Sequence, residues 1–357
     1  MNIFSNFPYK TKILLSFFCF CSLLNAQEVK EISINIKDTT SLKLSQIAES
    51  VTSVSLNKNI GRITFLHLTN QYIFVCGMSE IYQFTTSGDF VKEVDCENYI
   101  YSITGDDDTK EIYVATNGKK IICYDYSLNK KEEYKTKYTS NSIFYHNKYI
   151  YLHSFMELKV GIVFGISKIN TSTGKETFYD LKEYNLNSNS KTTHGAISNA
   201  DFFIYNNELL LAPSMDSVIY KIGDNKVFAS FSWEVKPKED YYYHKPFPLS
   251  NKGIIGNYIY INYIIRSLSD KYPNNRRCLY LKNLKSGKIY NINSKKDKNS
   301  HGTIYDDFYH TGYFDLMRQS NKPGYFYFIR QNNVVRNQID NLNANKGVVF
   351  FIVKTKE

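Results

Sequence analysis

The sequence predicts an all-β protein, a six-bladed β-propeller with four-stranded antiparallel blades, and two observations carry that prediction. Helical periodicity is nearly absent, and short runs rich in Ile, Val, Tyr, Phe and Thr recur between Gly, Asn, Asp and Ser residues. The runs also repeat as a unit of four short strands about every forty to fifty residues, which is the period of one propeller blade. The unit occurs at residues 60–96, 100–135, 140–181, 198–235 and 253–292, with a divergent sixth copy at 303–354.

The two ends of the chain predict how the ring closes. A single blade cannot bury both of its faces, so the units must close on themselves. Residues 51–56 (VTSVSL) and 348–353 (VVFFIV) predict strands, and we expect these N- and C-terminal strands to pair in one blade. Because no Pro-, Ser- or Gly-rich linker divides residues 27–357, we expect a single domain. A two-sheet sandwich is the alternative all-β architecture, but it is usually much shorter.

Residues 1–26 predict a signal peptide and therefore export to the periplasm, the cell surface or the medium. Two lysines precede a charge-free apolar run at 13–24 (ILLSFFCFCSLL), and Ala26 supplies a small residue for cleavage. About twelve residues span about 18 Å as a helix, against a hydrocarbon core of about 30 Å, so we expect no transmembrane span. A lipid anchor on Cys19 or Cys21 is the alternative, although bulky Phe residues next to them favour cleavage after Ala26.

The charge distribution argues against a nucleic-acid-binding protein, and the cysteine spacing argues against a cysteine-ligated metal site. Removing the two leader lysines lowers the formal charge from +10 to +8, and the remaining Lys residues are scattered among Glu and Asp. Since Arg, the usual bidentate base reader, is scarce, we expect no nucleic-acid partner. Cys76, Cys96, Cys123 and Cys278 show no CxxC pair and no metal-type spacing with His. Export would permit disulfides, but buried single thiols in separate strands are favoured.

No linear motif indicates catalysis, a metal or a cofactor. The chain lacks G-x-S-x-G, G-x-x-x-x-G-K-[ST] and H-E-x-x-H. Propeller enzymes assemble sites from loops of several blades, so a hydrolase or lyase acting on an extracellular polymer, with or without a metal, remains the alternative function. Its acid–base residues would be Asp306, Asp307, His301 and His310.

Two further polar groups have simpler interpretations. Asp106, Asp107 and Asp108 are adjacent, so their side chains alternate in direction and cannot all converge on one calcium ion. A solvated turn is the favoured interpretation. His194, His244 and His310 lie in separate units and could meet at the channel mouth, but nothing in their spacing indicates a metal site.

Aromatic residues are the one enriched chemical class, with 31 Tyr and 24 Phe. Many alternate within predicted strands, where they pack between blades. One predicted loop holds Tyr241, Tyr242, Tyr243 and His244, and Trp233 lies just upstream. Aromatic faces beside polar groups suit sugar rings or a protein surface, so we place the predicted ligand-binding site there.

Several short motifs of the chain follow the pattern of one known family. Residues 44–51 (LSQIAESV), followed by 54–56 (VSL), are similar to the family's opening segment. Residues 81–90 (IYQFTTSGDF) resemble its I-x-x-F-D-x-x-G-x-F hairpin, and 216–222 (DSVIYKI) its D-x-I-Y-x-I strand. The segments 305–308 (YDDF) and 345–349 (NKGVV) resemble its N-D-I and N-P-x-L signatures. On these motifs the chain resembles a Bacteroides-type family of exported six-bladed β-propellers. The resemblance covers essentially the whole mature chain and implies an extracytoplasmic propeller, often lipid-anchored, without a generally established activity.

The chain also departs from that pattern. Residues 95–99 (DCENY) stand where the family often has a Gly-Pro-Gly-Glu-Tyr loop, and Gly347 replaces the Pro of the terminal motif. Any ligand carried by that loop in the family is therefore not implied here. The sequence predicts an exported, monomeric, non-catalytic binding or scaffold propeller that recognises a glycan, a peptide or a cell-envelope protein.

Overall fold

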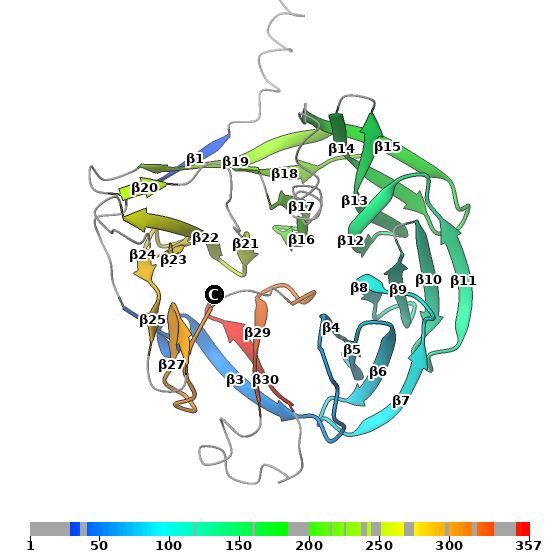
Figure 1. Cartoon of the computed structure of the whole chain (residues 1–357), viewed down its shortest axis with the longest axis horizontal. Helices are drawn as coiled ribbons and strands as arrows, with labels where there is room; N and C mark the ends of the chain where they lie inside the picture. Colours follow the sequence, from blue (N-terminus) through cyan, green and yellow to red (C-terminus); the bar gives the residue numbers. More distant parts are fainter. Residues whose placement is uncertain are drawn as a thin grey trace, which may run out of the picture.

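The fold is an all-β propeller, a ring of sheets arranged around a central axis (Figure 1). The predicted signal peptide at 1–26 lies outside the described residues. Within that part of the chain the helical element is one 3-10 turn, η1 (Leu44–Gln46). The computed structural model describes residues 29–35, 41–117, 119–158, 161–184, 200–214, 216–224, 226–236, 241–243, 251–267, 275–296, 300–315, 320–331 and 348–357.

The described residues form seven blades, numbered here in chain order. Blades 1 to 3 each consist of four antiparallel strands that follow one another from the centre to the rim (Figure 1). Their strands are β4 (Phe65–Leu68), β5 (Tyr72–Cys76), β6 (Glu80–Thr85), β7 (Phe90–Asp95), β8 (Ile100–Asp106), β9 (Glu111–Thr116), β10 (Lys120–Asp125), β11 (Lys130–Lys135), β12 (Thr139–His146), β13 (Tyr149–Leu158), β14 (Gly161–Asn170) and β15 (Glu176–Tyr184).

Blades 4 and 5 keep this four-stranded arrangement and gain one strand each. In blade 4, β1 (Lys30–Asn35) pairs in parallel with β19; in blade 5, β20 (Tyr241–Tyr243) pairs antiparallel with β22. Their four-stranded parts are β16 (Ala200–Tyr205), β17 (Glu208–Pro213), β18 (Val218–Ile222) and β19 (Val227–Lys236), and β21 (Lys252–Ile255), β22 (Tyr258–Ser267), β23 (Asn275–Asn283) and β24 (Ile289–Asn293).

Blades 6 and 7 each include a strand from the N-terminal segment. Blade 6 combines β2 (Leu42–Lys43), β27 (Ile304–Asp306) and β28 (Gly312–Phe314), with the short pair β25 (Lys295–Lys296) and β26 (His301–Gly302) beside it. Blade 7 combines β29 (Tyr325–Gln331), β30 (Val348–Thr355) and β3 (Ala48–Ser55).

The predicted number of blades was wrong: there are seven rather than six. The divergent unit at 303–354 contains two blades, because β27–β28 and β29–β30 form separate sheets. Each of these sheets is too small to stand alone, and each is extended by a strand from residues 42–55. The N-terminal segment therefore extends two blades, whereas the sequence predicted that it would complete one.

The predicted closure of the ring is confirmed by the pairing of β3 with β30. The two strands run antiparallel, with Val51 opposite Val353 and Val54 opposite Phe350. The β6–β7 turn of blade 1 then packs on the end of β3, and Gly88 is required there. It has φ +98°, and a Cβ atom would lie 2.2 Å from the carbonyl oxygen of Ser55. Closure thus joins blade 7 to blade 1 through backbone contacts.

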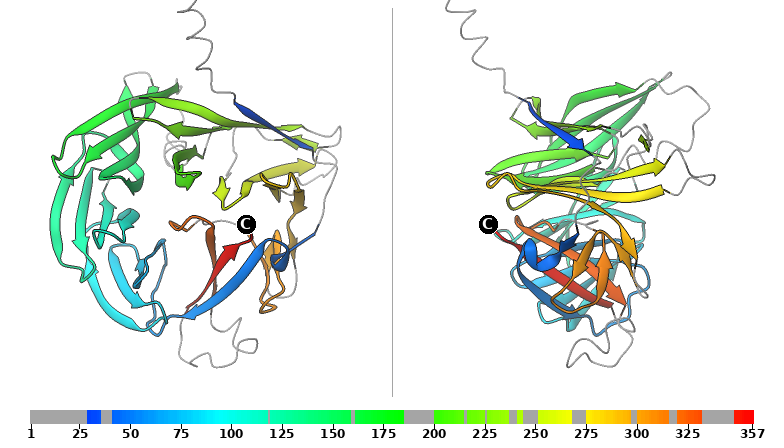
Figure 2. Two further views of the ribbon diagram at one scale, coloured as in Figure 1. Left: turned by 180° about the vertical axis from the view of Figure 1, so that it is seen from behind. Right: turned by 90° about the vertical axis from the view of Figure 1, so that its left-hand side faces the viewer.

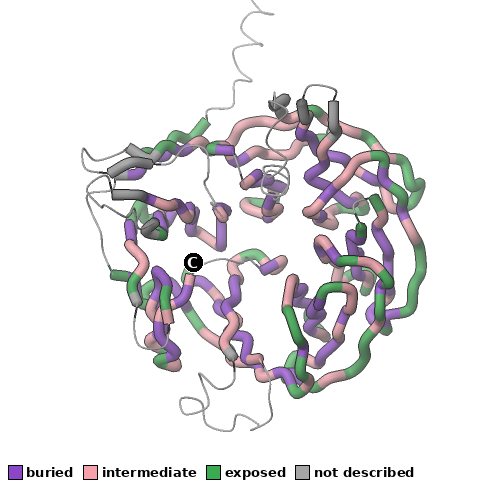
Figure 3. The backbone as a smooth tube through the Cα atoms, in the orientation of Figure 1, coloured by how far each residue is buried: buried purple, intermediate pink, exposed green. Residues whose placement is uncertain are grey.

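The outer strands differ in how their free edges are protected. Strand β11 (KKEEYK) is largely exposed and charged, which discourages pairing with another chain (Figure 3). Strand β19 (VFASFSWEVK) has no such run of charges, and β1 covers its edge (Figure 2). Ile32 and Ile34 of β1 are buried in the same core as Trp233. The N-terminal strand therefore covers the edge that charge does not protect.

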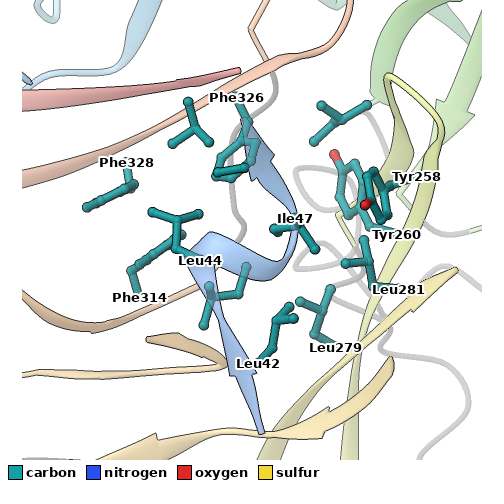
Figure 4. Close-up of a cluster of buried hydrophobic side chains, with 14 of the residues drawn as sticks. Leu42, Leu44, Ile47, Tyr258, Tyr260, Leu279, Leu281, Phe314, Phe326 and Phe328 are labelled. Atoms are coloured by element: carbon teal, nitrogen blue, oxygen red, sulfur yellow. The ribbon is translucent and has the colours of Figure 1, made fainter. Parts of the chain in front are cut away.

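One large apolar core joins blades 5, 6 and 7 to the N-terminal segment (Figure 4). Leu42, Leu44 and Ile47 insert between Leu279 of blade 5 and Phe328 of blade 7. All five side chains are 5% exposed or less. Burial of one such side chain contributes about 1.5–3 kcal/mol, so this core holds the closing blades together.

Candidate functional site

The two faces of the ring differ in the length of their connections. At one end of the strands, called here the turn face, blades 1 to 5 have hairpins of two to five residues, from 69–71 in blade 1 to 284–288 in blade 5. At the opposite end, called here the loop face, the strands are joined through residues 185–199, 237–251 (which include β20) and 268–274. Long connections are uncommon in compact domains and are the usual carriers of function. The loop face is therefore the candidate recognition face.

A buried lysine lies where the connection 237–251 enters blade 5. Lys252 is the first residue of β21, and its side chain is fully buried. Its ammonium group donates hydrogen bonds to the carbonyl oxygens of Pro213 and Asp216, at 2.5 Å for the second. Pro213 is the last residue of β17, and Asp216 lies in the β17–β18 connection of blade 4. The lysine thus joins two neighbouring blades beneath the loop face.

Two carboxylates share the site of Lys252. Burial lowers the pKa of Lys252 to about 7, against the opposing effect of Asp216 and Asp201. Burial also raises the pKa of Asp201 to about 6, against the effect of Lys252. Asp216 accepts a hydrogen bond from the Tyr220 hydroxyl at 2.5 Å. Each charge therefore depends on the others for compensation.

This charge cluster includes residues at the start of two strands, each of which follows a long connection. Asp201 is the second residue after the connection 185–199, and Lys252 follows 237–251 directly. Because the lysine has no exposed surface, it cannot act as a nucleophile toward an external substrate. The geometry supports a role in positioning the loop face rather than in chemistry.

Trp233, one of the predicted ligand-binding residues, lies in a strand and is buried. It belongs to β19 and is 6% exposed, in contact with the β1 core. The Lys252 ammonium lies 5.9 Å from its ring centroid. Its indole N–H has no hydrogen-bond partner among the described residues. The ring therefore supports the blade 4–blade 5 junction and does not present a face to a ligand.

The other predicted ligand-binding residues lie at the rim of blade 5. Tyr241, Tyr242 and Tyr243 form β20, with Tyr241 opposite Ser267. His244 lies outside the described residues, as does His194. Because β20 pairs with the end of β22 that leads into 268–274, the three tyrosines belong to the loop face.

The predicted acid–base group is divided among separate structural contacts. Buried Asp306 accepts hydrogen bonds from the backbone N–H groups of Phe308 and Tyr309 and from both N–H and hydroxyl of Thr311. These contacts shape the β27–β28 turn. His301 and His310 are exposed, and neither is among the described partners of the two carboxylates.

Asp307 fastens the N-terminal segment to blade 6. It accepts hydrogen bonds from the backbone N–H of Ser45 at 2.9 Å and from the Ser45 hydroxyl at 2.6 Å. Burial alone would raise the pKa of Asp307, but the Ser45 bonds outweigh it, so the pKa lies below its usual value. The contact ties η1 to the β27–β28 turn.

We expect Asp307→Ala to lower the free energy of unfolding by about 1–2 kcal/mol, because two donors of Ser45 lose their acceptor. A carboxylate whose pKa is lower in the folded state than in the unfolded state stabilises the folded protein at pH values above the unfolded pKa of about 4. This stabilisation is lost as the pH falls through the pKa of the folded state. Urea unfolding at about pH 7 and pH 3 measures both effects. Exposed Asp108→Ala is the control; equal effects of the two variants would contradict the assignment.

The acidic run at 106–108 links blades rather than forming a fully solvated turn. Asp107 accepts hydrogen bonds from the Asn70 backbone N–H at 3.0 Å and from the Tyr126 hydroxyl at 2.8 Å. Asn70 belongs to blade 1 and Tyr126 to blade 2. Asp108 is exposed, as predicted. The described residues contain no group of three His, Cys, Asp or Glu side chains that could hold a metal ion.

One buried histidine was missed from the sequence. His67 of β4 is 2% exposed, and burial lowers its pKa to about 4. Its Nδ1 has no hydrogen-bond partner among the described residues. The ring of His67 fits because residue 105 of β8 is glycine. A Cβ atom at Gly105 would lie only 2.7 Å from Nε2 of His67. No local signal distinguishes this histidine from an exposed one.

The cysteines match the favoured interpretation of buried single thiols. Cys76, Cys96, Cys123 and Cys278 are all buried and free. Cys96 lies just after β7 rather than within a strand, and it accepts a hydrogen bond from the Tyr124 hydroxyl at 3.5 Å. Burial raises the pKa of both Cys76 and Cys123, which keeps these thiols protonated at neutral pH.

Comparison with known proteins shows the fold alone. No protein-family model matches the chain, and no curated protein matches it. A solved Bacteroides fragilis NCTC 9343 protein, named as exported, is similar with a TM-score of 0.62 at 11% identity, over 92% of this chain and 100% of that chain. A structural genomics protein of unknown function from Bacteroides thetaiotaomicron VPI-5482 is similar with a TM-score of 0.50 at 13% identity, over 89% and 75% of the chains. Among the described residues, no helix is long and apolar enough to cross a membrane.

Proposed function

We propose that the protein is an exported, non-catalytic binding or scaffold module that recognises a glycan, a peptide or a partner protein through its loop face. The asymmetry of the ring carries this proposal. Hairpins of two to five residues join the described strands of blades 1 to 5 at the turn face, whereas fifteen residues (185–199) separate the end of β15 from the start of β16 at the loop face. A propeller whose longer connections gather at one face is suited to recognition.

The predicted leader supports export and release into the periplasm or to the cell surface. The Lys-flanked apolar run at 13–24 and Ala26 carry that part of the proposal. The motif resemblance to exported Bacteroides-type propellers agrees with it, as does the likeness to the B. fragilis protein. Mass spectrometry of the mature N-terminus tests the proposed export and cleavage. A chain that begins at residue 27 would support cleavage after Ala26, whereas a chain that begins with a lipid-bearing Cys would show that the protein is anchored to a membrane.

Replacement of the β20 aromatics tests the proposed recognition site. We expect Tyr241→Ala with Tyr242→Ala to weaken binding of a ligand found on a glycan array or a cell-envelope protein array by about tenfold or more, because tyrosine is one of the residue types that dominate recognition surfaces. Ile289→Ala is the control, since it removes an exposed apolar side chain at the turn-face end of β24. Equal losses in both variants, or no loss in the tyrosine variant, would contradict this placement.

A further inference from the structure

An exposed apolar surface lies on the loop face between blades 1 and 2. Met78, in the β5–β6 turn, is 48% exposed, and Tyr99, just before β8, is 39% exposed. The rings of Tyr99 and Tyr101 lie 5.2 Å apart at an interplanar angle of 57°. The backbone N–H of Ile100 donates to the carbonyl oxygen of Met78 at 2.8 Å, so the two segments adjoin. These three side chains are called here the Met78–Tyr99 surface.

The backbone beneath this surface is held in place by hydrogen bonds. Cys96 N–H donates to the Ser79 carbonyl oxygen at 2.8 Å, and Asn117 N–H donates to the Tyr99 carbonyl oxygen at 3.1 Å. Glu97 adopts φ 59°, a left-handed conformation that is uncommon for a residue with a side chain, and its N–H donates to Asp95 at 2.7 Å. Exposed apolar side chains on a preorganised loop lose little entropy on binding.

The two segments that carry Met78 and Tyr99 are acidic, in contrast to the chain as a whole, although exposed Lys119 lies in the adjoining segment 117–119. Glu80, Asp95 and Glu97 flank Met78 and Tyr99 within the same two segments. Within the described residues, none of these three carboxylates takes part in an ion pair, whereas Glu93, Glu111 and Glu133 each pair with lysine. A local negative rim on a chain of formal charge +10 favours a cationic partner.

We infer that the Met78–Tyr99 surface docks a cationic, partly apolar segment of a partner protein. Arg or Lys side chains of that segment lay their apolar stems on Met78 and their charged ends over the rings of Tyr99 and Tyr101. The carboxylates Glu80, Asp95 and Glu97 neutralise the same charges. Tyr and Arg are the residues that most often dominate protein–protein contacts. The inference rests on the proposed binding role but uses a surface separate from residues 233–244.

Fluorescence anisotropy with a labelled peptide of alternating Arg and Leu residues tests the inference on the full mature chain. We expect saturable binding that weakens by at least about tenfold in Tyr99→Ala with Met78→Ser. The triple variant Glu80→Gln, Asp95→Asn, Glu97→Gln should also weaken peptide binding. The affinity of this variant for the peptide should lose most of its dependence on salt between about 50 and 300 mM. Ile289→Ser, which removes an equally exposed apolar side chain elsewhere, should bind like the wild type.

The controls separate this inference from the proposed function. The Tyr241→Ala, Tyr242→Ala variant should bind the peptide unchanged, and a Glu–Leu peptide of the same length should not bind. Absence of saturable binding by the Arg–Leu peptide, equal binding of the Glu–Leu peptide, or unchanged binding by Tyr99→Ala with Met78→Ser would overturn the inference. If the wild type binds a glycan but not the Arg–Leu peptide, and Tyr99→Ala with Met78→Ser abolishes glycan binding, the Met78–Tyr99 surface binds carbohydrate instead. That result would overturn this inference but would still support the proposed binding function.

Discussion

Replacing Phe328 with Ala is expected to lower the free energy of unfolding by about 3–5 kcal/mol, a large share of the about 5–15 kcal/mol that stabilises a typical protein. Phe328 is 5% exposed. Its ring is stacked between Phe314, at 4.0 Å and 9°, and Phe351, at 4.7 Å and 5°. Loss of the ring leaves a cavity and removes both stacking contacts.

The position of Phe328 explains why its effect should be global. Phe314 belongs to blade 6, and Phe328 and Phe351 belong to the closing blade 7. A cavity there weakens the contact between the two smallest blades, whose separation would open the ring. Thermal unfolding followed by far-ultraviolet circular dichroism should show a midpoint several degrees lower.

Exposed Phe308 offers a matched control for this substitution. It is 40% exposed in the β27–β28 turn, so Phe308→Ala should change the stability by no more than about 0.5 kcal/mol. Phe328→Leu keeps most of the volume and should cost about 1–1.5 kcal/mol. If Phe328→Ala and Phe308→Ala had the same midpoint of thermal unfolding, the aromatic stack would not be the contact that holds blades 6 and 7 together.

The four-stranded parts of blades 1 to 5 were predictable from the sequence because each of these parts is continuous in the chain. The predicted unit 100–135 coincides with β8–β11, and 140–181 lies within β12–β15. Their strands alternate and end in Gly or Asn turns, so local pattern is sufficient. The pairing of the terminal strands was also predictable, because two apolar runs without a local partner need each other.

Blades 6 and 7 were not predictable in the same way. Strand β2 has two residues, and it pairs with β27, which lies about 260 positions later in the chain. Such a strand has no periodicity to detect, and its existence depends on a tertiary contact such as that of Ser45 with Asp307. The six-blade count followed from treating 303–354 as one unit, because no residue pattern marks the break between β28 and β29.

The candidate site was less accessible to sequence reasoning than the fold. Trp233 was predicted to lie beside the tyrosines on the surface, but β1, two hundred positions earlier, covers its strand. Lys252 precedes three apolar residues in β21, which resembles an ordinary strand end. Its burial is decided by carbonyl oxygens of Pro213 and Asp216 in another blade. Charge compensation over such separations leaves no local signal.

Replacing Lys252 with Met is expected to lower the free energy of unfolding by about 3–5 kcal/mol at neutral pH. The substitution keeps much of the side-chain volume but removes the buried positive charge. Two carbonyl oxygens then lose their donor, and Asp201 and Asp216 lose their compensating charge. Exposed Lys285→Met is the control and should stay within about 0.5 kcal/mol of the wild type.

The dependence on pH follows from the lowered pKa of Lys252. Between its folded pKa of about 7 and the usual value of about 10.4, the unfolded chain binds more protons than the folded chain. Stability contributed by this group therefore rises with pH across that window and is lost as the pH falls through about 7. The Met variant lacks this rise, so its deficit relative to the wild type should widen from about pH 7 to pH 9.

The single tryptophan provides a direct probe of this site. Trp233 lies 5.9 Å from the Lys252 ammonium, so its fluorescence should change in Lys252→Met and titrate in the wild type. Adding Asp201→Asn to Lys252→Met should recover part of the lost stability, because one uncompensated carboxylate is then neutral. A Met variant as stable as the wild type at every pH, with unchanged Trp233 emission, would show that no buried charge joins blades 4 and 5.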